Sequence, residues 1–125
     1  MLIQLKIENI ALIEIIEINF EKGLNIITGD SGSGKSLILD SLNVLFGGTN
    51  IPLKHVIRPG KDHCAIEAKF SSSLQINNWL IQNGFKSNSI LIIKRISSTI
   101  INTTKYFIFL KMIHKCTRTV INSFD

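Results

Sequence analysis

Apolar and polar residues alternate in two segments near the N-terminus, which is the pattern of strands with one buried face. Residues 2–8 alternate Ile or Leu with Gln, Lys or Glu, and residues 16–21 repeat the alternation. The doublet Ile15–Ile16 interrupts it, which predicts a bulge or bend at that point. Because few residues connect the two segments, they are predicted to form an antiparallel pair.

The pattern changes at residue 24. Residues 24–28 are few and mostly apolar, which predicts a strand covered on both faces, as in α/β sheets. Residues 35–46 follow with helical spacing, and Gly47–Gly48 is expected to end this helix. The apolar stripe of the helix consists of Leu39, Leu42 and Phe46, widened by Ile38 and Leu45.

The second half of the chain holds further patterns of both kinds. Residues 49–64 contain both prolines and are predicted to be a loop. Residues 65–70 and 90–96 have the composition and alternation of strands. Residues 74–83, bounded by three serines and a glycine, are predicted to be a helix. Residues 106–110 have strand composition, and no convincing period follows them.

Composition and charge place the chain among globular proteins. The 125 residues suffice for one domain with a core, and 45% hydrophobic against 18% charged residues exclude general disorder. Residues 1–70 carry seven basic and eight acidic side chains, whereas residues 71–125 carry seven basic and one acidic. The basic half indicates either attraction to nucleic acid or a tail without a selected surface.

Cysteine usage and hydropathy exclude several classes. Cys64 and Cys116 lie far apart, which indicates no disulfide framework. His63 and His114 stand near these cysteines, but in a loop and an unpatterned tail, so a metal site is not favoured. No apolar run is long enough to span a bilayer, and glutamates interrupt the N-terminal apolar stretch, so a cytoplasmic protein without a membrane segment is expected.

Residues 29–36 match the phosphate-binding pattern G-x-x-x-x-G-K-[ST] at every fixed position. Its glycines let backbone N–H groups turn inward, where the positive end of the following helix helps them to hold a di- or triphosphate. Lys35 is expected at the β- and γ-phosphates and the Ser36 hydroxyl at Mg²⁺. The predicted binding residues are Gly29, Asp30, Ser31, Gly32, Ser33, Gly34, Lys35 and Ser36.

Acidic residues after this P-loop are few. An ATPase also needs an acid at the end of an apolar strand, the Walker B residue, which holds Mg²⁺. Asp40 lies inside the predicted helix, Asp62 in a loop, Glu67 in an alternating segment and Asp125 at the end of the sequence. None fits the Walker B position. The sequence therefore predicts nucleotide binding, assigns no catalytic residue and leaves ATPase activity open.

Six short segments occur in a recognisable order around the P-loop. They are residues 9–13, 17–20, 23–29, 56–60, 65–70 and 92–95. Their sequences and order closely resemble the start of the bacterial RecN family, which are SMC-like DNA repair ATPases. The resemblance covers about residues 1–96 and is most specific in residues 9–36.

This resemblance implies an α/β fold, namely the N-terminal lobe of an ABC/SMC-type P-loop ATPase head, with antiparallel strands before the P-loop strand. RecN-like proteins act in recombinational repair of DNA double-strand breaks and hold ATP between two heads, each assembled from both ends of a chain. ATP and Mg²⁺ would then be bound by the P-loop residues, with DNA, a homodimer partner or a complementary head fragment as partners. Arg58 matches an arginine near the nucleotide or the DNA-facing surface in such heads.

The sequence departs from the family near Ser97. Residues 1–96 are expected to form a partial ATPase head, and residues 97–125 a divergent basic tail. No coiled coil, Leu-Ser-Gly-Gly signature or Walker B segment is found, which suggests a truncated or frame-shifted relic or one part of a split gene. Asp30 and Ser33 stand where Glu and Ala are more frequent, which backbone binding of phosphate tolerates.

Two other functions stay open. One is a small P-loop kinase or nucleotide-binding switch unrelated to DNA repair, and the other is a non-catalytic module that modulates a full-length head. The strands before the P-loop favour the RecN-like head over a small kinase. Basic and aromatic residues alternate loosely in residues 105–118, which indicates either binding to single-stranded nucleic acid or a composition without function.

Overall fold

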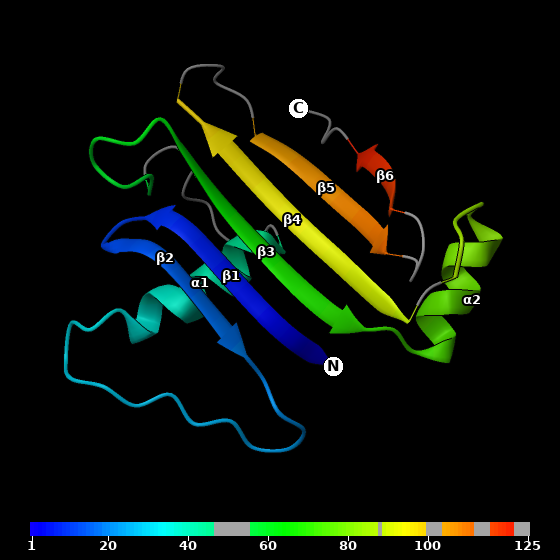
Figure 1. Ribbon diagram of the computed structural model, residues 1–125, viewed down its shortest axis with the longest axis horizontal. Coiled ribbons are helices and arrows are strands. Elements are labelled where there is room, and N and C mark those ends of the chain that lie inside the picture. The colour runs from blue at the N-terminus through cyan, green and yellow to red at the C-terminus, as the bar shows by residue number, and fades with distance from the viewer. Residues whose placement is uncertain (47–55, 88, 100–103, 112–115, 122–125) are drawn as a thin grey trace.

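The computed structural model describes residues 1–46, 56–87, 89–99, 104–111 and 116–121. In this part of the chain, one antiparallel sheet has the strand order β2-β1-β3-β4-β5-β6 and is accompanied by two helices (Figure 1). The strands are β1 Leu2–Ile10, β2 Ile13–Asn19, β3 His63–Ser71, β4 Ile90–Ser98, β5 Thr104–Lys111 and β6 Cys116–Ile121, and the helices are α1 Lys35–Leu45 and α2 Leu74–Gln82.

One face of the sheet carries α1 and the hydrophobic core (Figure 1). Leu5 and Ile7 of β1 meet Ile66 and Ala68 of β3 across the antiparallel ladder, and all four side chains are fully buried. The residues of α1 that pack on them are Ile38, Val44 and Leu45. The guanidinium of Arg95 on β4 donates to the Val44 carbonyl, which joins the last turn of α1 to the sheet.

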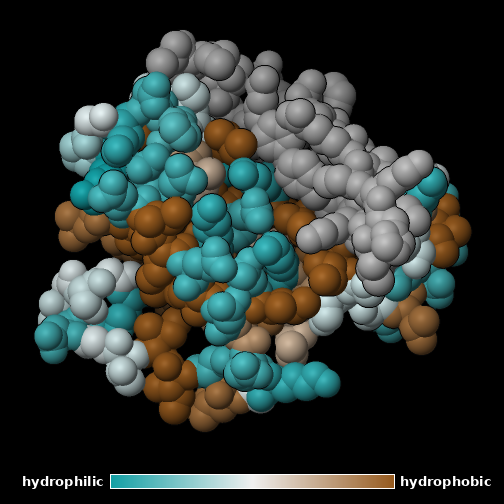
Figure 2. Space-filling model, viewed as in Figure 1, coloured by the Kyte–Doolittle hydropathy of each residue, from teal (hydrophilic) through white to brown (hydrophobic). Residues whose placement is uncertain are grey.

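The opposite face of the sheet is polar. Lys6 of β1 pairs with Glu17 of β2 on one side and with Glu67 of β3 on the other, and Glu67 pairs with Lys94 of β4. Lys94 Nζ lies 3.3 Å from Glu67 Oε2. Figure 2 shows hydrophilic side chains across the middle of this face. A shift of one residue would turn these charges into the core, so this row of alternating charge supports the observed register.

Several expected elements are confirmed. The segments 2–8, 65–70 and 90–96 lie in β1, β3 and β4, and 106–110 lies in β5. The predicted helix over 74–83 is α2, where Ser73 Oγ accepts a hydrogen bond from the Ile76 N–H at 3.3 Å. This bond satisfies one of the N–H groups that a helix start leaves without a backbone partner.

The strand expected over residues 24–28 is wrong. The segment is extended but belongs to none of the strands of the described chain, and it forms the long loop below β2 in Figure 1. Leu24 and Ile26 are 86% and 74% exposed. The apolar composition predicted burial, but no strand of the described residues pairs with the segment, and its side chains stay exposed.

Two finer predictions also need correction. No bulge occurs at Ile15–Ile16, because both residues pair regularly with Glu8 and Ile7 of β1, and Ile15 simply faces outward. The buried stripe of α1 is rotated from the expected one, since Leu39 is 67% exposed whereas Ser41 is buried. Ser41 fits the core because its Oγ donates to the Leu37 carbonyl at 2.6 Å and so keeps its hydroxyl paired.

Candidate nucleotide-binding site

The P-loop is the turn that connects the exposed segment 24–28 to α1. Gly32 and Gly34 have φ angles of 81° and 94°, in the left-handed region that side chains disfavour. Gly34 is the N-cap of α1, and no side chain caps the first turn of the helix. The first N–H groups of α1 are therefore open toward the loop, where they can donate to an anion.

Lys35 lies inside this loop. Its ammonium donates to the carbonyls of Gly29 and Asp30 and, at 3.2 Å, to Ser33 Oγ. A Cβ on Gly29 would stand 2.7 Å from the same Ser33 oxygen, so the loop closes tightly at this point. The positive charge of Lys35 is thus held by the backbone that would surround a bound phosphate.

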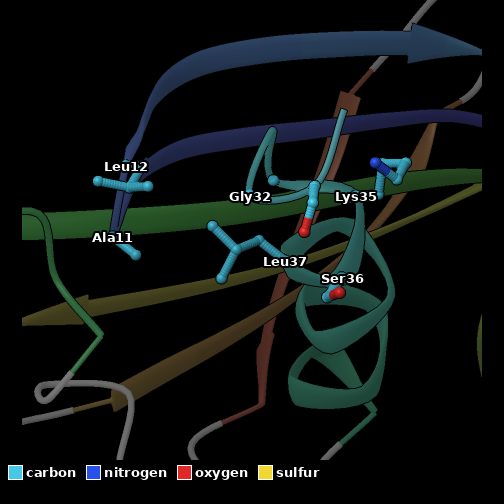
Figure 3. A pocket seen from close by; sticks show the side chains of 8 residues that line it. Ala11, Leu12, Gly32, Lys35, Ser36 and Leu37 are labelled. Atoms are coloured by element: carbon cyan, nitrogen blue, oxygen red, sulfur yellow. The ribbon is translucent and has the colours of Figure 1, made fainter. Parts of the chain in front are cut away.

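A cavity of about 410 Å³ opens between the P-loop and the turn that joins β1 to β2 (Figure 3). Ala11 and Leu12 of that turn lie on one side of it, and the start of α1 lies on the other, with Leu37 between them (Figure 3). The volume lies within the range of small-molecule sites. The lining residues are Ala11, Leu12, Ser31, Gly32, Gly34, Lys35, Ser36 and Leu37.

The structure thus brings Ser31, Gly32, Gly34, Lys35 and Ser36 of the predicted set to the cavity, while Gly29, Asp30 and Ser33 act behind them as partners of Lys35. Ser36 is exposed at the first turn of α1, where its hydroxyl could reach a cation. No experiment tests these roles, and they stay predictions.

Ala11 and Leu12 line the cavity although no sequence motif marks them as ligand-binding residues. Both stand in a segment that carries the family resemblance, but their apolar side chains carry no signal for a ligand. Ala11 has a φ angle of 47° and Asn9 one of 55°, so two residues with side chains take the left-handed conformation in this turn. Only the fold places this turn beside the P-loop, which follows it later in the sequence at residues 29–36.

Residues 56–58 hold this turn in place. The Ala11 N–H donates to the Val56 carbonyl at 2.8 Å, and the Arg58 N–H donates to the Asn9 carbonyl at 2.9 Å. Arg58 Nη1 also donates to the Leu12 carbonyl at 2.5 Å. The family resemblance implied a position of Arg58 near the nucleotide or a DNA-facing surface. In the structure, Arg58 contacts the wall of the cavity through the Leu12 carbonyl.

The acidic residues after the P-loop stay away from the cavity. Asp40 is exposed on α1, and Glu67 lies on the polar face of the sheet, opposite the face that carries α1. Asp62 Oδ1 lies 2.9 Å from His63 Nδ1, and the hydrogen bond between them is the main reason why the pKa of Asp62 is below its usual value. Asp125 lies outside the described residues.

The weak metal hypothesis gains no support. The described residues hold no group of three or more His, Cys, Asp or Glu side chains arranged for a metal ion. Cys64 is fully buried, and the loss of solvent around it raises the pKa of its thiol to about 11. His114 and the side chain of Cys116 lie outside the described part, as do the side chains of the basic tail between 105 and 118.

The chain is similar to known proteins in sequence and in fold. A family model described as an AAA domain matches residues 4–119. A DNA repair protein RecN from Synechocystis sp. is 46% identical over 80 residues, which are 64% of this chain and 13% of that protein. RecN from Rickettsia conorii is 36% identical over 94 residues, 75% of this chain and 17% of that protein. The chain thus spans less than a fifth of the length of these relatives.

A solved structure from work on ATP-driven dimerization and DNA-stimulated activation of SMC ATPases has a TM-score of 0.68 and 20% identity, covering 86% of this chain and 68% of its own. The predicted fold class, the N-terminal lobe of an ABC/SMC-type head, is confirmed.

The chain belongs to the AAA domain family. Within it, the predicted resemblance to the N-terminal region of RecN proteins is confirmed. In the described residues, neither helix has the length and hydropathy needed to cross a membrane.

Proposed function

We propose that this chain is the ATP-binding part of a RecN-like protein that acts in recombinational repair of DNA double-strand breaks, in the cytoplasm. One observation carries the proposal: α1 begins without a side-chain cap beside a cavity that contains Lys35. A small kinase is the weaker alternative, because two antiparallel strands precede the P-loop and the relatives are RecN proteins.

ATP would bind with its phosphates in the loop and its nucleoside toward the turn. The N–H groups of residues 31–35 would donate to phosphate oxygens, and the Lys35 ammonium would exchange its loop carbonyls for the β- and γ-phosphates. Mg²⁺ would neutralise phosphate charge and take the Ser36 hydroxyl as a ligand. Ala11, Leu12 and Leu37 would cover the less polar nucleoside end.

The isolated chain would bind ATP without hydrolysing it. Hydrolysis needs an acid that holds Mg²⁺ and a group that orients water beside the γ-phosphate. None of the acids that follow the P-loop in the described residues lines the cavity. A complementary part of the head, or a second head, would supply these groups.

The apolar surface next to the P-loop supports such a partner. Leu24, Ile26 and Leu39 are each more than 60% exposed, although the first two stand in a segment with the composition of a buried strand. Pairing of residues 24–28 with a strand of the complementary part would satisfy the backbone and cover these side chains. DNA as a further partner rests on the names of the RecN relatives.

Calorimetric titration with ATP and Mg²⁺ tests the binding proposal. Lys35→Ala should weaken ATP binding by about a hundredfold, because a charge-assisted contact to phosphate is lost together with loop closure. Lys22→Ala, which removes the same charge from an exposed turn, is the matched control and should bind as the unmodified chain does. Equal affinity of the Lys35→Ala and unmodified chains would overturn the assignment of the P-loop.

The rate of phosphate release from excess ATP tests the proposal that the isolated chain does not hydrolyse ATP. We expect no turnover above the rate with Lys35→Ala. Steady turnover that Lys35→Ala abolishes would show that the chain holds a complete catalytic site.

A further inference from the structure

Arg58 is the basic side chain that connects residues 56–58 to the wall of the cavity. Its backbone is fixed from two sides, since its N–H donates to Asn9 in β1 and its carbonyl accepts from the Lys61 N–H at 3.0 Å. Ile57 forms a bridge with Ile10 at the same place. The guanidinium therefore starts from a rigid backbone that lies between the β1–β2 turn and β3.

The turn that it contacts is conformationally unfavourable. Asn9, near the end of β1, and Ala11, in the turn, both have positive φ angles, and alanine keeps such an angle only where the surrounding structure enforces it. The backbone bonds from Val56 and Arg58 fix Asn9 and Ala11. These two backbone bonds do not fix Leu12. Leu12 lines the cavity and is 76% exposed, so few packing contacts hold its side chain.

The guanidinium of Arg58 holds the backbone of Leu12. Arg58 Nη1 donates to the Leu12 carbonyl at 2.5 Å across 46 positions of sequence, and a charged donor makes a stronger bond than a neutral one. With its charge directed at that carbonyl, Arg58 is not among the residues that line the cavity. Its influence on a ligand would pass through Ala11 and Leu12.

We propose that Arg58 is a positioning residue, which fixes the β1–β2 turn so that Ala11 and Leu12 form a defined wall for the nucleoside end of the nucleotide. The proposal rests on nucleotide binding at the P-loop. It assigns Arg58 an effect on the nucleoside and none on the phosphates. A ligand with the same phosphates and no nucleoside separates these two roles.

The test compares ATP with inorganic tripolyphosphate, each titrated with Mg²⁺ by calorimetry. Arg58→Ala should weaken ATP binding about tenfold, the effect expected when one charge-assisted hydrogen bond is lost, and change tripolyphosphate binding less than twofold. Arg58→Lys should recover part of the ATP affinity, because its ammonium can still donate to a carbonyl. Lys61→Ala removes a nearby exposed charge and should change neither affinity.

Arg58→Gln keeps part of the side-chain stem and should show the same split if Arg58→Ala does not fold. Equal losses for ATP and tripolyphosphate would overturn the proposal and indicate direct contact of Arg58 with phosphate. Unchanged affinities in both Arg58→Ala and Arg58→Gln would also overturn it. An unmodified chain that binds neither ligand would contradict nucleotide binding itself, which is a different failure.

Discussion

Apolar residues in two regions of the chain differ in burial, namely those of α1 that face the sheet and those of the segment before the P-loop. Toward the sheet, Ile38, Val44 and Leu45 pack on strands whose side chains reach complete burial. Before the P-loop, by contrast, the apolar residues Leu24, Ile26 and Ile27 are exposed. The presence of a neighbouring strand, rather than hydrophobicity alone, therefore decides which apolar residues of this chain form a core.

The packed and the exposed regions also differ in their proposed roles. The packed region contains the sheet and the buried face of α1, and the contacts between them fix the position of the helix. The exposed region contains the P-loop, which we propose binds phosphates, and the apolar residues that we propose a partner covers. A rigid element that carries an open loop is the common arrangement for binding sites.

The largest effect is expected in the packed region. Ile66→Ala should lower the free energy of unfolding by about 3–4 kcal/mol, because it removes a fully buried side chain at the centre of the sheet and leaves a cavity. Urea denaturation followed by circular dichroism measures this. Ile15→Ala is the matched control, since Ile15 is 61% exposed on the polar side of β2 and should cost less than about 1 kcal/mol. Similar losses in both variants would contradict the assignment of the core.

A smaller effect concerns the pH dependence of the same region. Burial raises the pKa of the Cys64 thiol to about 11, above its usual value of roughly 8.5 in an unfolded chain. The unfolded state therefore loses the proton first, and Cys64 lowers stability progressively between about pH 8.5 and pH 11, by roughly 3 kcal/mol in total. Below pH 8.5 it contributes no pH dependence.

The difference between the unmodified chain and Cys64→Ala isolates this effect, because all other groups titrate in both. Both chains also carry Cys116→Ser, so that Cys64 is the only thiol that differs between them. The unfolding free energies of the chain with Cys64 and of the Cys64→Ala chain should converge or cross as the pH rises from 8 to 10.5. Parallel curves would show that water reaches Cys64 in the folded state.

The smallest effect on stability is expected in the exposed region. Leu24→Gln combined with Ile26→Gln should change the free energy of unfolding by less than about 0.5 kcal/mol per residue, because both side chains are exposed already. The same change should reduce self-association in light scattering, since it removes exposed apolar surface. A loss of several kcal/mol would show that residues 24–28 are packed.

The sequence predicted elements whose pattern depends on local contacts. Residues 2–8 and 65–70 alternate between apolar and polar positions, and Ser73 supplies the cap of α2. The sequence therefore shows the type of each element, although the pairing of β1 with β3 comes from the fold. The strand β6, Cys116–Ile121, was not predicted, because its position depends on pairing with β5 and not on a period of its own. The same dependence on a partner explains the wrong prediction over residues 24–28.

The candidate site was predictable in part for the same reason. Gly32, Gly34 and Lys35 act through the geometry of one continuous loop, which a motif describes fully. Leu12 and Arg58 come together over 46 positions through one carbonyl, and a backbone acceptor leaves no trace in the sequence. The positive φ angle of Ala11 is equally invisible, since alanine rarely adopts it.

Hydrogen exchange with and without ATP and Mg²⁺ is the most direct test of nucleotide binding at the P-loop, because it reports on the packed sheet and on the exposed loop in one experiment. We expect that amides of residues 30–37 and 11–12 gain protection when ATP is added, that amides of β3 keep theirs, and that Lys35→Ala abolishes the gain. Unchanged exchange in residues 30–37 at saturating ATP, or equal gains in the Lys35→Ala chain, would contradict it.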